Sequence, residues 1–186
     1  GGATIELRGL DHEGAALAQP VRFDLLRLSW KVEMAGDGSG TASFRFELDD
    51  FLTAAIDATT VGIATDMGTA DATVTVDADL KGMTDALGAF LQMRQDSTLD
   101  GTASLKTTLN ASLGRKALGA ARLSIDAKLD RLSARDGKGR PLPIDPTATM
   151  VLRASFDPRT PLAWSGMSKA TGTAKVETCE LRAGTV

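Results

Sequence analysis

The sequence predicts an α+β fold that is mainly antiparallel β, a curved sheet of about eight to ten strands with two short helices packed on one face. One observation is a series of segments in which apolar and polar residues alternate, separated by turns rich in Gly and Asp. Another is an internal echo, in which residues 42–49 align with residues 72–79. Each copy alternates, reaches an Asp and then changes to a helical spacing, so both strands are expected to lead into a helix.

The composition is that of a globular chain of 186 residues with 42 % hydrophobic and 4 % aromatic residues. We expect one β-rich domain over residues 1–186, and a join near residues 96–101 if the chain divides. Since the apolar residues are mostly small, each strand buries little area and many strands must cooperate.

The first half of the chain alternates over residues 3–10, 21–34 and 41–48. In the second of these segments the apolar parity changes at Leu25 and Leu26, which predicts a bulge or a sharp bend there. Residues 36–40 hold three glycines and predict a hairpin turn. His12 is expected in a polar loop.

Two helices are expected where the spacing changes. Asp49 can cap a helix near residues 50–57, in which Phe51, Leu52, Ala55 and Ile56 share one face. Strands at residues 59–65 and 72–80 follow. A second helix is expected at residues 82–94, with an apolar stripe formed by Met83, Leu87, Phe90 and Leu91.

The second half reads as strand after strand, at residues 105–113, 121–129, 148–156 and 174–181. The tripeptide Gly-Thr-Ala occurs at Gly40, Gly101 and Gly172, and we interpret it as a reused start of a strand.

Several function classes are disfavoured. The net charge of −3 and the pI near 5.2 argue against nucleic-acid binding. The sequence contains no run of roughly 18 apolar residues, so no transmembrane segment is predicted. His12 is the single histidine and Cys179 the single cysteine, too few imidazoles and thiolates for a zinc centre. We therefore expect no metal and no cofactor.

Catalysis is also disfavoured. Asp77 and Asp79 lie two residues apart and share a strand face, as paired carboxylates of a glycosidase or calcium ligands could. Thr73 and Thr75 share that face, however, which is typical of a solvated surface. No Gly-x-Ser-x-Gly motif is present. We expect no catalytic residues and no enzyme.

The helices and the sheet together suggest a binding site. A layer of amphipathic helices on a sheet leaves a seam, and a seam lined by Met suits an apolar ligand. Candidate ligand-binding residues are Phe51, Ile56, Met83, Leu87, Phe90, Leu91 and Trp164.

Two strand-like stretches, Thr-Val-Thr-Val-Asp-Ala-Asp-Leu from Thr73 and Ser-Ile-Asp-Ala-Lys-Leu-Asp-Arg-Leu from Ser124, are separated by the short helix-like segment from Met83 to Leu91. This texture resembles bacterial envelope β-repeat proteins of the AsmA/TamB kind and related uncharacterised periplasmic families. The resemblance implies a curved sheet whose concave face holds acyl chains, in the periplasm or cell envelope, without catalysis.

The function expected is therefore a non-enzymatic cell-envelope protein that binds a lipid or other apolar ligand between sheet and helices, with a role in transport. The alternative is a structural or assembly module that binds protein partners through its sheet edges, without a ligand.

Overall fold

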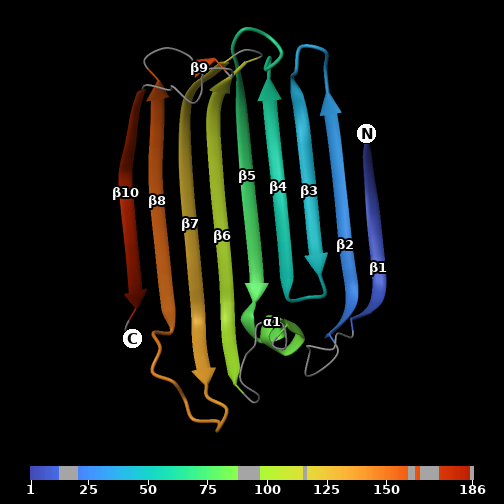
Figure 1. Cartoon of the computed structure of the whole chain (residues 1–186), viewed down its shortest axis with the longest axis vertical. Coiled ribbons are helices and arrows are strands. Elements are labelled where there is room, and N and C mark those ends of the chain that lie inside the picture. Colours follow the sequence, from blue (N-terminus) through green and yellow to red (C-terminus); the bar gives the residue numbers. More distant parts are fainter. Residues whose placement is uncertain (13–20, 88–96, 115–116, 159–161, 164–171, 185–186) are drawn as a thin grey trace.

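Nearly every strand pairs with the strand that precedes it and the strand that follows it in the sequence, all antiparallel (Figure 1). The computed structural model describes residues 1–12, 21–87, 97–114, 117–158, 162–163 and 172–184. In chain order the elements are β1 (Gly2–His12), β2 (Val21–Met34), β3 (Gly40–Leu48), β4 (Leu52–Val61), β5 (Gly68–Asp79), α1 (Leu80–Leu87), β6 (Thr98–Leu113), β7 (Ala117–Arg135), β8 (Thr147–Pro158), β9 (Leu162–Ala163) and β10 (Gly172–Gly184).

The sheet is open. Its strand order is β1-β2-β3-β4-β5-β6-β7-β8-β10, and the two-residue β9 pairs with β7 beside this row. Strands β1 and β10 lie at opposite sides of the sheet (Figure 1). The prediction of a mainly antiparallel β fold is confirmed. One of the longest antiparallel pairings joins β5 and β6, from the pair Gly68 and Leu113 to the pair Asp79 and Thr102.

The expectation of two helices is wrong, because α1 is the one helix among the described residues. Residues 52–61, most of the first expected helix included, form β4. A spacing that placed Phe51, Leu52, Ala55 and Ile56 on a helical face also fits the alternation of Leu52 with Ile56 along a strand. Short apolar runs carry both periods, and here the pairing of β4 with β3 and β5 decides.

The bulge expected at Leu25 and Leu26 is absent from the pairing of β1 with β2, whose register continues from Leu7–Leu26 to Arg8–Leu25. The change of parity falls where the pairing of β2 with β3 ends. Strand β3 ends opposite Leu26, and Asp49 then turns with φ of 47°. Its carboxylate accepts a hydrogen bond from the Leu25 amide (2.6 Å), and its own amide donates to the Leu25 carbonyl (2.8 Å).

Register shifts occur instead farther along the sheet. Between β6 and β7 the register shifts around Gly101 (φ 128°), opposite Arg131 (φ 53°), and again between Ala111 and Leu113. Between β8 and β10 it shifts between Val176 and Thr178. His12, expected in a loop, is the last residue of β1.

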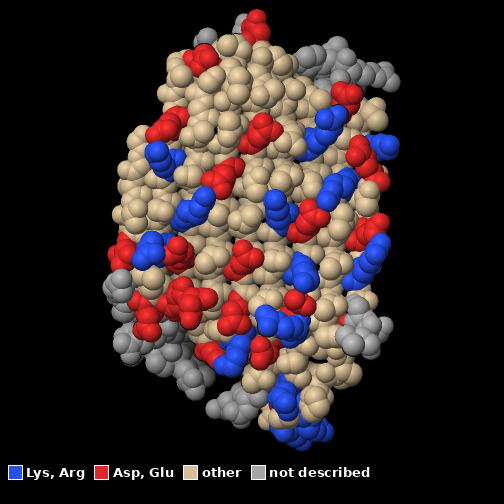
Figure 2. Space-filling view, turned by 180° about the vertical axis from the view of Figure 1, so that it is seen from behind, with Lys and Arg blue, Asp and Glu red and all other residues tan. Residues whose placement is uncertain are grey.

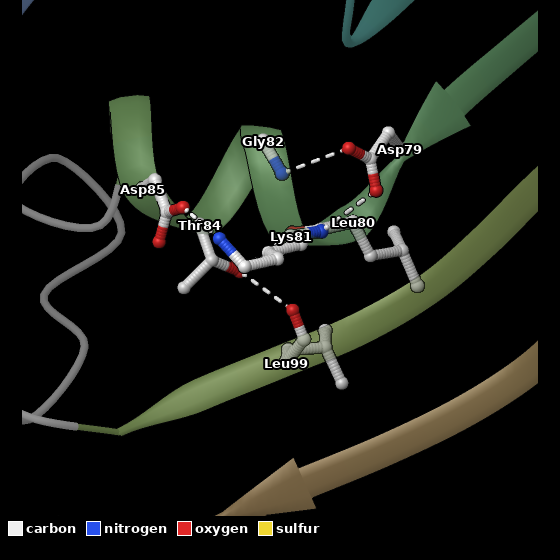
Figure 3. A network of polar contacts seen from close by, with 7 residues as sticks. All are labelled: Asp79, Leu80, Lys81, Gly82, Thr84, Asp85 and Leu99. Atoms are coloured by element: carbon white, nitrogen blue, oxygen red, sulfur yellow. Dashed lines mark hydrogen bonds and ion pairs between the residues drawn. The ribbon is translucent and has the colours of Figure 1, made fainter.

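Helix α1 is capped by Asp79, the counterpart of Asp49 in the internal echo (Figure 3). The two Asp79 carboxylate oxygens accept bonds from the amides of Lys81 (3.2 Å) and Gly82 (3.3 Å). Lys81 forms an ion pair with Asp85 one turn on (2.6 Å). The described helix is Leu80–Leu87, and the remainder of the expected helix, residues 88–94, lies outside the described residues.

Phe51 anchors α1 to the turn between β3 and β4. Its side chain is 4 % exposed, and the Cβ of an alanine at Gly82 would lie 2.5 Å from the Phe51 Cβ. The close approach explains why a glycine stands in the first turn of the helix.

Candidate apolar ligand-binding face

The register of the strands sorts side chains by polarity onto the two faces of the sheet. Residues directly opposite each other in antiparallel strands project from the same face. One row across the sheet reads Ile5, Leu28, Phe46, Ala54, Val76, Leu105, Ala127, Met150 and Leu181. The row beside it reads Ala3, Trp30, Phe44, Ile56, Val74, Thr107, Ile125, Leu152 and Cys179.

Two further rows flank these. One reads Val32, Ala42, Ala58, Ala72, Leu109, Leu123, Ala154 and Val176, and the other reads Leu26, Leu48, Leu52, Ala78, Ala103, Leu129, Ala148 and Ala183. Thr107 is the one polar side chain in the four rows. We call this surface the apolar face.

Among the described residues, none packs over most of the apolar face. Leu48, Phe51 and Ala111 are the buried hydrophobic residues among those described. Leu48 lies in the row at one end of the apolar face, and Ala111 lies just beyond the row at the other end. In its middle, Trp30 is 38 % exposed, and Ile56 and Leu109 are each 41 % exposed. Helix α1 lies at one end of the sheet, beside the turn from β3 to β4 (Figure 1), and leaves these residues open to solvent.

The size of the apolar face exceeds that of an ordinary surface patch. Strands lie about 4.8 Å apart and same-face residues about 6.6 Å apart, so one side chain covers roughly 32 Å² of sheet. Four rows of eight or nine residues therefore cover roughly 1,100 Å². The largest apolar patch of a typical monomer is about 300–600 Å² and is itself often functional. A patch of this size is typical of surfaces that bind a ligand or a partner.

A shallow trough crosses the β5–β8 half of the apolar face. Its volume is about 330 Å³, and its lining on this face is Val76, Ala78, Ala103, Leu105, Ala127, Leu129, Ala148, Met150 and Leu181. The trough forms because alanines stand at four of these positions, whereas the β2–β4 half carries Trp30, Phe44 and Phe46. A depression walled by apolar side chains is suited to an apolar ligand.

The opposite face is polar and carries charged side chains of both signs, distributed among the strands (Figure 2). Arg27 on β2 bridges Glu6 on β1 (3.1 Å) and Glu47 on β3 (2.7 Å). Arg153 on β8 pairs with Asp126 on β7 (2.8 Å). The hydrogen bond from Arg153 lowers the pKa of Asp126 below its ordinary value, against the opposing effect of partial burial. Solvent-exposed pairs of this kind contribute little stability, and this face is the one suited to water.

The residues proposed from the sequence do not come together as one seam. Ile56 lies in the middle of the apolar face, between Phe44 and Val74. Phe51 is buried beside α1, which also carries the half-buried Met83. Leu87 ends α1. The candidates Phe90, Leu91 and Trp164 lie outside the described residues.

The trough residues lie on strands that the alternation predicted, but none of them was among the candidate ligand-binding residues. The signal that distinguishes them is the alanine content of β5–β8.

Groups suited to catalysis do not converge in the described part of the chain. Asp77 is exposed on the polar face, and Asp79 is engaged in capping α1. No cluster of three or more His, Cys, Asp or Glu side chains suited to a metal ion occurs among the described residues. Cys179 is exposed. Within the same residues, no helix has the length and apolarity needed to cross a bilayer.

Comparison with known proteins finds no matching family model, no matching curated protein and no matching solved structure.

Proposed function

We propose that this chain is a non-enzymatic protein of the bacterial cell envelope that binds the acyl chain of a lipid, or a similar apolar molecule, on its open apolar face. The observation that carries the proposal is the continuous row pattern, which leaves side chains such as Ile56 and Leu109 two-fifths exposed in the middle of the sheet. The ligand would lie in the trough over β5–β8 and not in a seam between sheet and helices.

Burial of hydrocarbon supplies the binding free energy in this proposal. Apolar area removed from water contributes about 25 cal/mol per Å². Both the ligand and the sheet would bury apolar area, since the exposed parts of Leu105, Leu129 and Met150 would be covered. The periplasmic setting and the role in transport rest on the resemblance to the AsmA/TamB kind of protein.

A pair of neighbouring substitutions tests the site. Ala103 and Ser104 are adjacent on β6, and Ala103 lies in a row of the apolar face while Ser104 projects from the polar face. Ala103→Asp places a carboxylate in the trough and should weaken binding of a long-chain fatty acid about ten-fold or more, because a charge beside hydrocarbon loses hydration. Ser104→Asp adds the same charge on the other face and should bind as the parent does.

Binding of palmitate can be followed by isothermal titration calorimetry. Ala103→Asp should weaken the measured affinity, and Ser104→Asp should leave it unchanged. Native mass spectrometry of protein purified without detergent provides an independent measurement, in which a discrete added mass is lost on organic extraction. If palmitate binds Ala103→Asp and Ser104→Asp with equal affinity, the trough is not the site.

A second candidate function is that of an assembly module. The observation that favours it is the open sheet, in which β1 pairs only with β2 and β10 only with β8 among the described residues. Outer strands present unpaired backbone groups that can pair with a strand of a partner. Association without bound ligand, measured by sedimentation velocity, distinguishes this function from lipid binding.

A further inference from the structure

Strand β10 lies at an edge of the sheet, where no described strand pairs with its outer side, and it carries unusually exposed apolar side chains. Leu181 is 78 % exposed and Val176 is 62 % exposed, the two highest values among the large hydrophobic residues described. Both belong to rows of the apolar face. Single exposed side chains need no explanation, but two on one edge strand mark a surface that can be covered.

The sequence of β10 is self-complementary in charge around Leu181. Glu180 and Arg182 flank it and project from the polar face, and within one chain their side chains lie 2.7 Å apart. If a second β10 pairs antiparallel with Leu181 opposite Leu181, Glu180 of each strand faces Arg182 of the other. Cys179 then faces Ala183 on the apolar face. Opposite charges directly across a pair of strands stabilise it, and like charges destabilise it.

The shift of register between Val176 and Thr178 sets the limit of this pairing. A bulge interrupts regular pairing along an edge. The regular segment from Thr178 to Gly184 is centred on Leu181. In the register with Leu181 opposite Leu181, every residue of the segment in one copy therefore lies opposite a residue of the same segment in the other copy.

We propose that two copies of this chain associate antiparallel through β10, about a twofold axis at Leu181. The twofold axis is perpendicular to the sheet, so the two apolar faces stay on the same side and become one wider surface. This inference deepens the second candidate function, pairing through sheet edges, and does not depend on ligand binding. The other edge is less suited, since antiparallel pairing about Ile5 on β1 would place Thr4, and not an opposite charge, across from Glu6.

Complementary charge substitutions test the register. Glu180→Arg places Arg opposite Arg182 twice per dimer, and Arg182→Glu places Glu opposite Glu180 twice. Each variant alone should dimerise about ten-fold more weakly than the parent. An equimolar mixture of the two variants restores both opposite-charge pairs and should recover the affinity of the parent. Sedimentation velocity over a range of concentrations measures all four samples, and circular dichroism confirms their folding.

Disulfide trapping gives a second readout. In a Cys179→Ser background, Leu181→Cys should form an intermolecular disulfide under mild oxidation, because the two Cβ atoms face each other across the axis. Thr173→Cys in the same background lies before the bulge, outside the paired segment, and should remain largely monomeric.

The outcomes distinguish pairing through β10 from pairing of two copies through sheet edges in general. If the charge variants dimerise as the parent does, or their mixture recovers nothing, pairing through β10 is wrong and β1 remains the edge for the second candidate function. If the parent is monomeric at roughly millimolar concentration, the low end of affinity for a specific contact, pairing of two copies through either edge is wrong. Palmitate binding to the trough is expected to be unchanged in the charge variants, since their substituted side chains project from the polar face.

Discussion

Equal Leu-to-Ala substitutions at Leu48 and at Leu109 should cost unequal amounts of stability. Leu48 is 8 % exposed, and Leu109 is 41 % exposed on the open part of the apolar face. The substitution removes three carbons, which contribute about 0.8 kcal/mol each when fully buried, or about 2.4 kcal/mol in all. Scaled by its buried fraction, Leu109→Ala should cost about 1.4 kcal/mol, without a cavity because the site is open to water.

Leu48→Ala loses about 2.2 kcal/mol of transfer free energy and also leaves a cavity between Leu26 and Leu52, so about 3 kcal/mol or more is expected. Urea unfolding at equilibrium measures both values. In thermal unfolding, about 2–4 °C per kcal/mol for a chain of this size gives shifts of roughly 6–12 °C and 3–6 °C. Equal losses at the two positions would refute the reasoning, because they would show that the middle of the apolar face is covered in the isolated protein.

Two further predictions concern packing and pH. Gly82→Ala should destabilise the protein by about 1 kcal/mol, because the crowding against Phe51, typically about 1–3 kcal/mol, outweighs a gain of up to about 1 kcal/mol in helix propensity. Gly36→Ala, whose added Cβ meets no atom within 4 Å, should leave urea unfolding nearly unchanged. Arg153→Leu should raise the pKa of Asp126 toward its ordinary value, measured by NMR titration of the carboxyl carbon. A carboxyl group whose pKa is lowered in the folded state stabilises the fold above its unfolded pKa, and this stabilisation is lost as the pH falls through the folded pKa. The variant should therefore lose less stability than the parent below about pH 4. If stability falls equally with pH in both proteins, the prediction is wrong.

The strands were predictable because alternation is a local signal. The faces expected from Ala42 to Leu48, from Ala72 to Ala78 and through the second half of the chain are the rows that the register assembles. Strand order was not predicted, since alternation states which residues share a face but not which strands are neighbours.

The two copies of the internal echo have similar sequences but different structures after the strand. Asp49 and Asp79 end similar strands, yet Asp49 enters a tight turn and Asp79 caps a helix. The difference lies in distant partners: Leu25 bonds both the amide and the carboxylate of Asp49, whereas the amide of Asp79 bonds the carbonyl of Phe51. Likewise Gly101, expected to begin a strand, lies at a register shift inside β6, where the pairing with β7 requires its φ of 128°.

The apolar ligand stays a prediction, and the surface proposed for it has changed. An apolar ligand was inferred from helix stripes, and the structure instead offers the strand faces themselves, because the segment around Ile56 is a strand. A sequence read segment by segment cannot show whether an apolar face has a second layer above it.

The order of the strands makes the width of the sheet adjustable in units of one hairpin. Because neighbours in the sheet are neighbours in the chain, a duplicated or deleted pair of strands leaves the direction and the polarity of all the others unchanged. Each such step alters the width by about 10 Å, twice the strand spacing. A lineage could therefore widen or narrow the apolar face by duplication or deletion of short gene segments, without redesigning any packed interior.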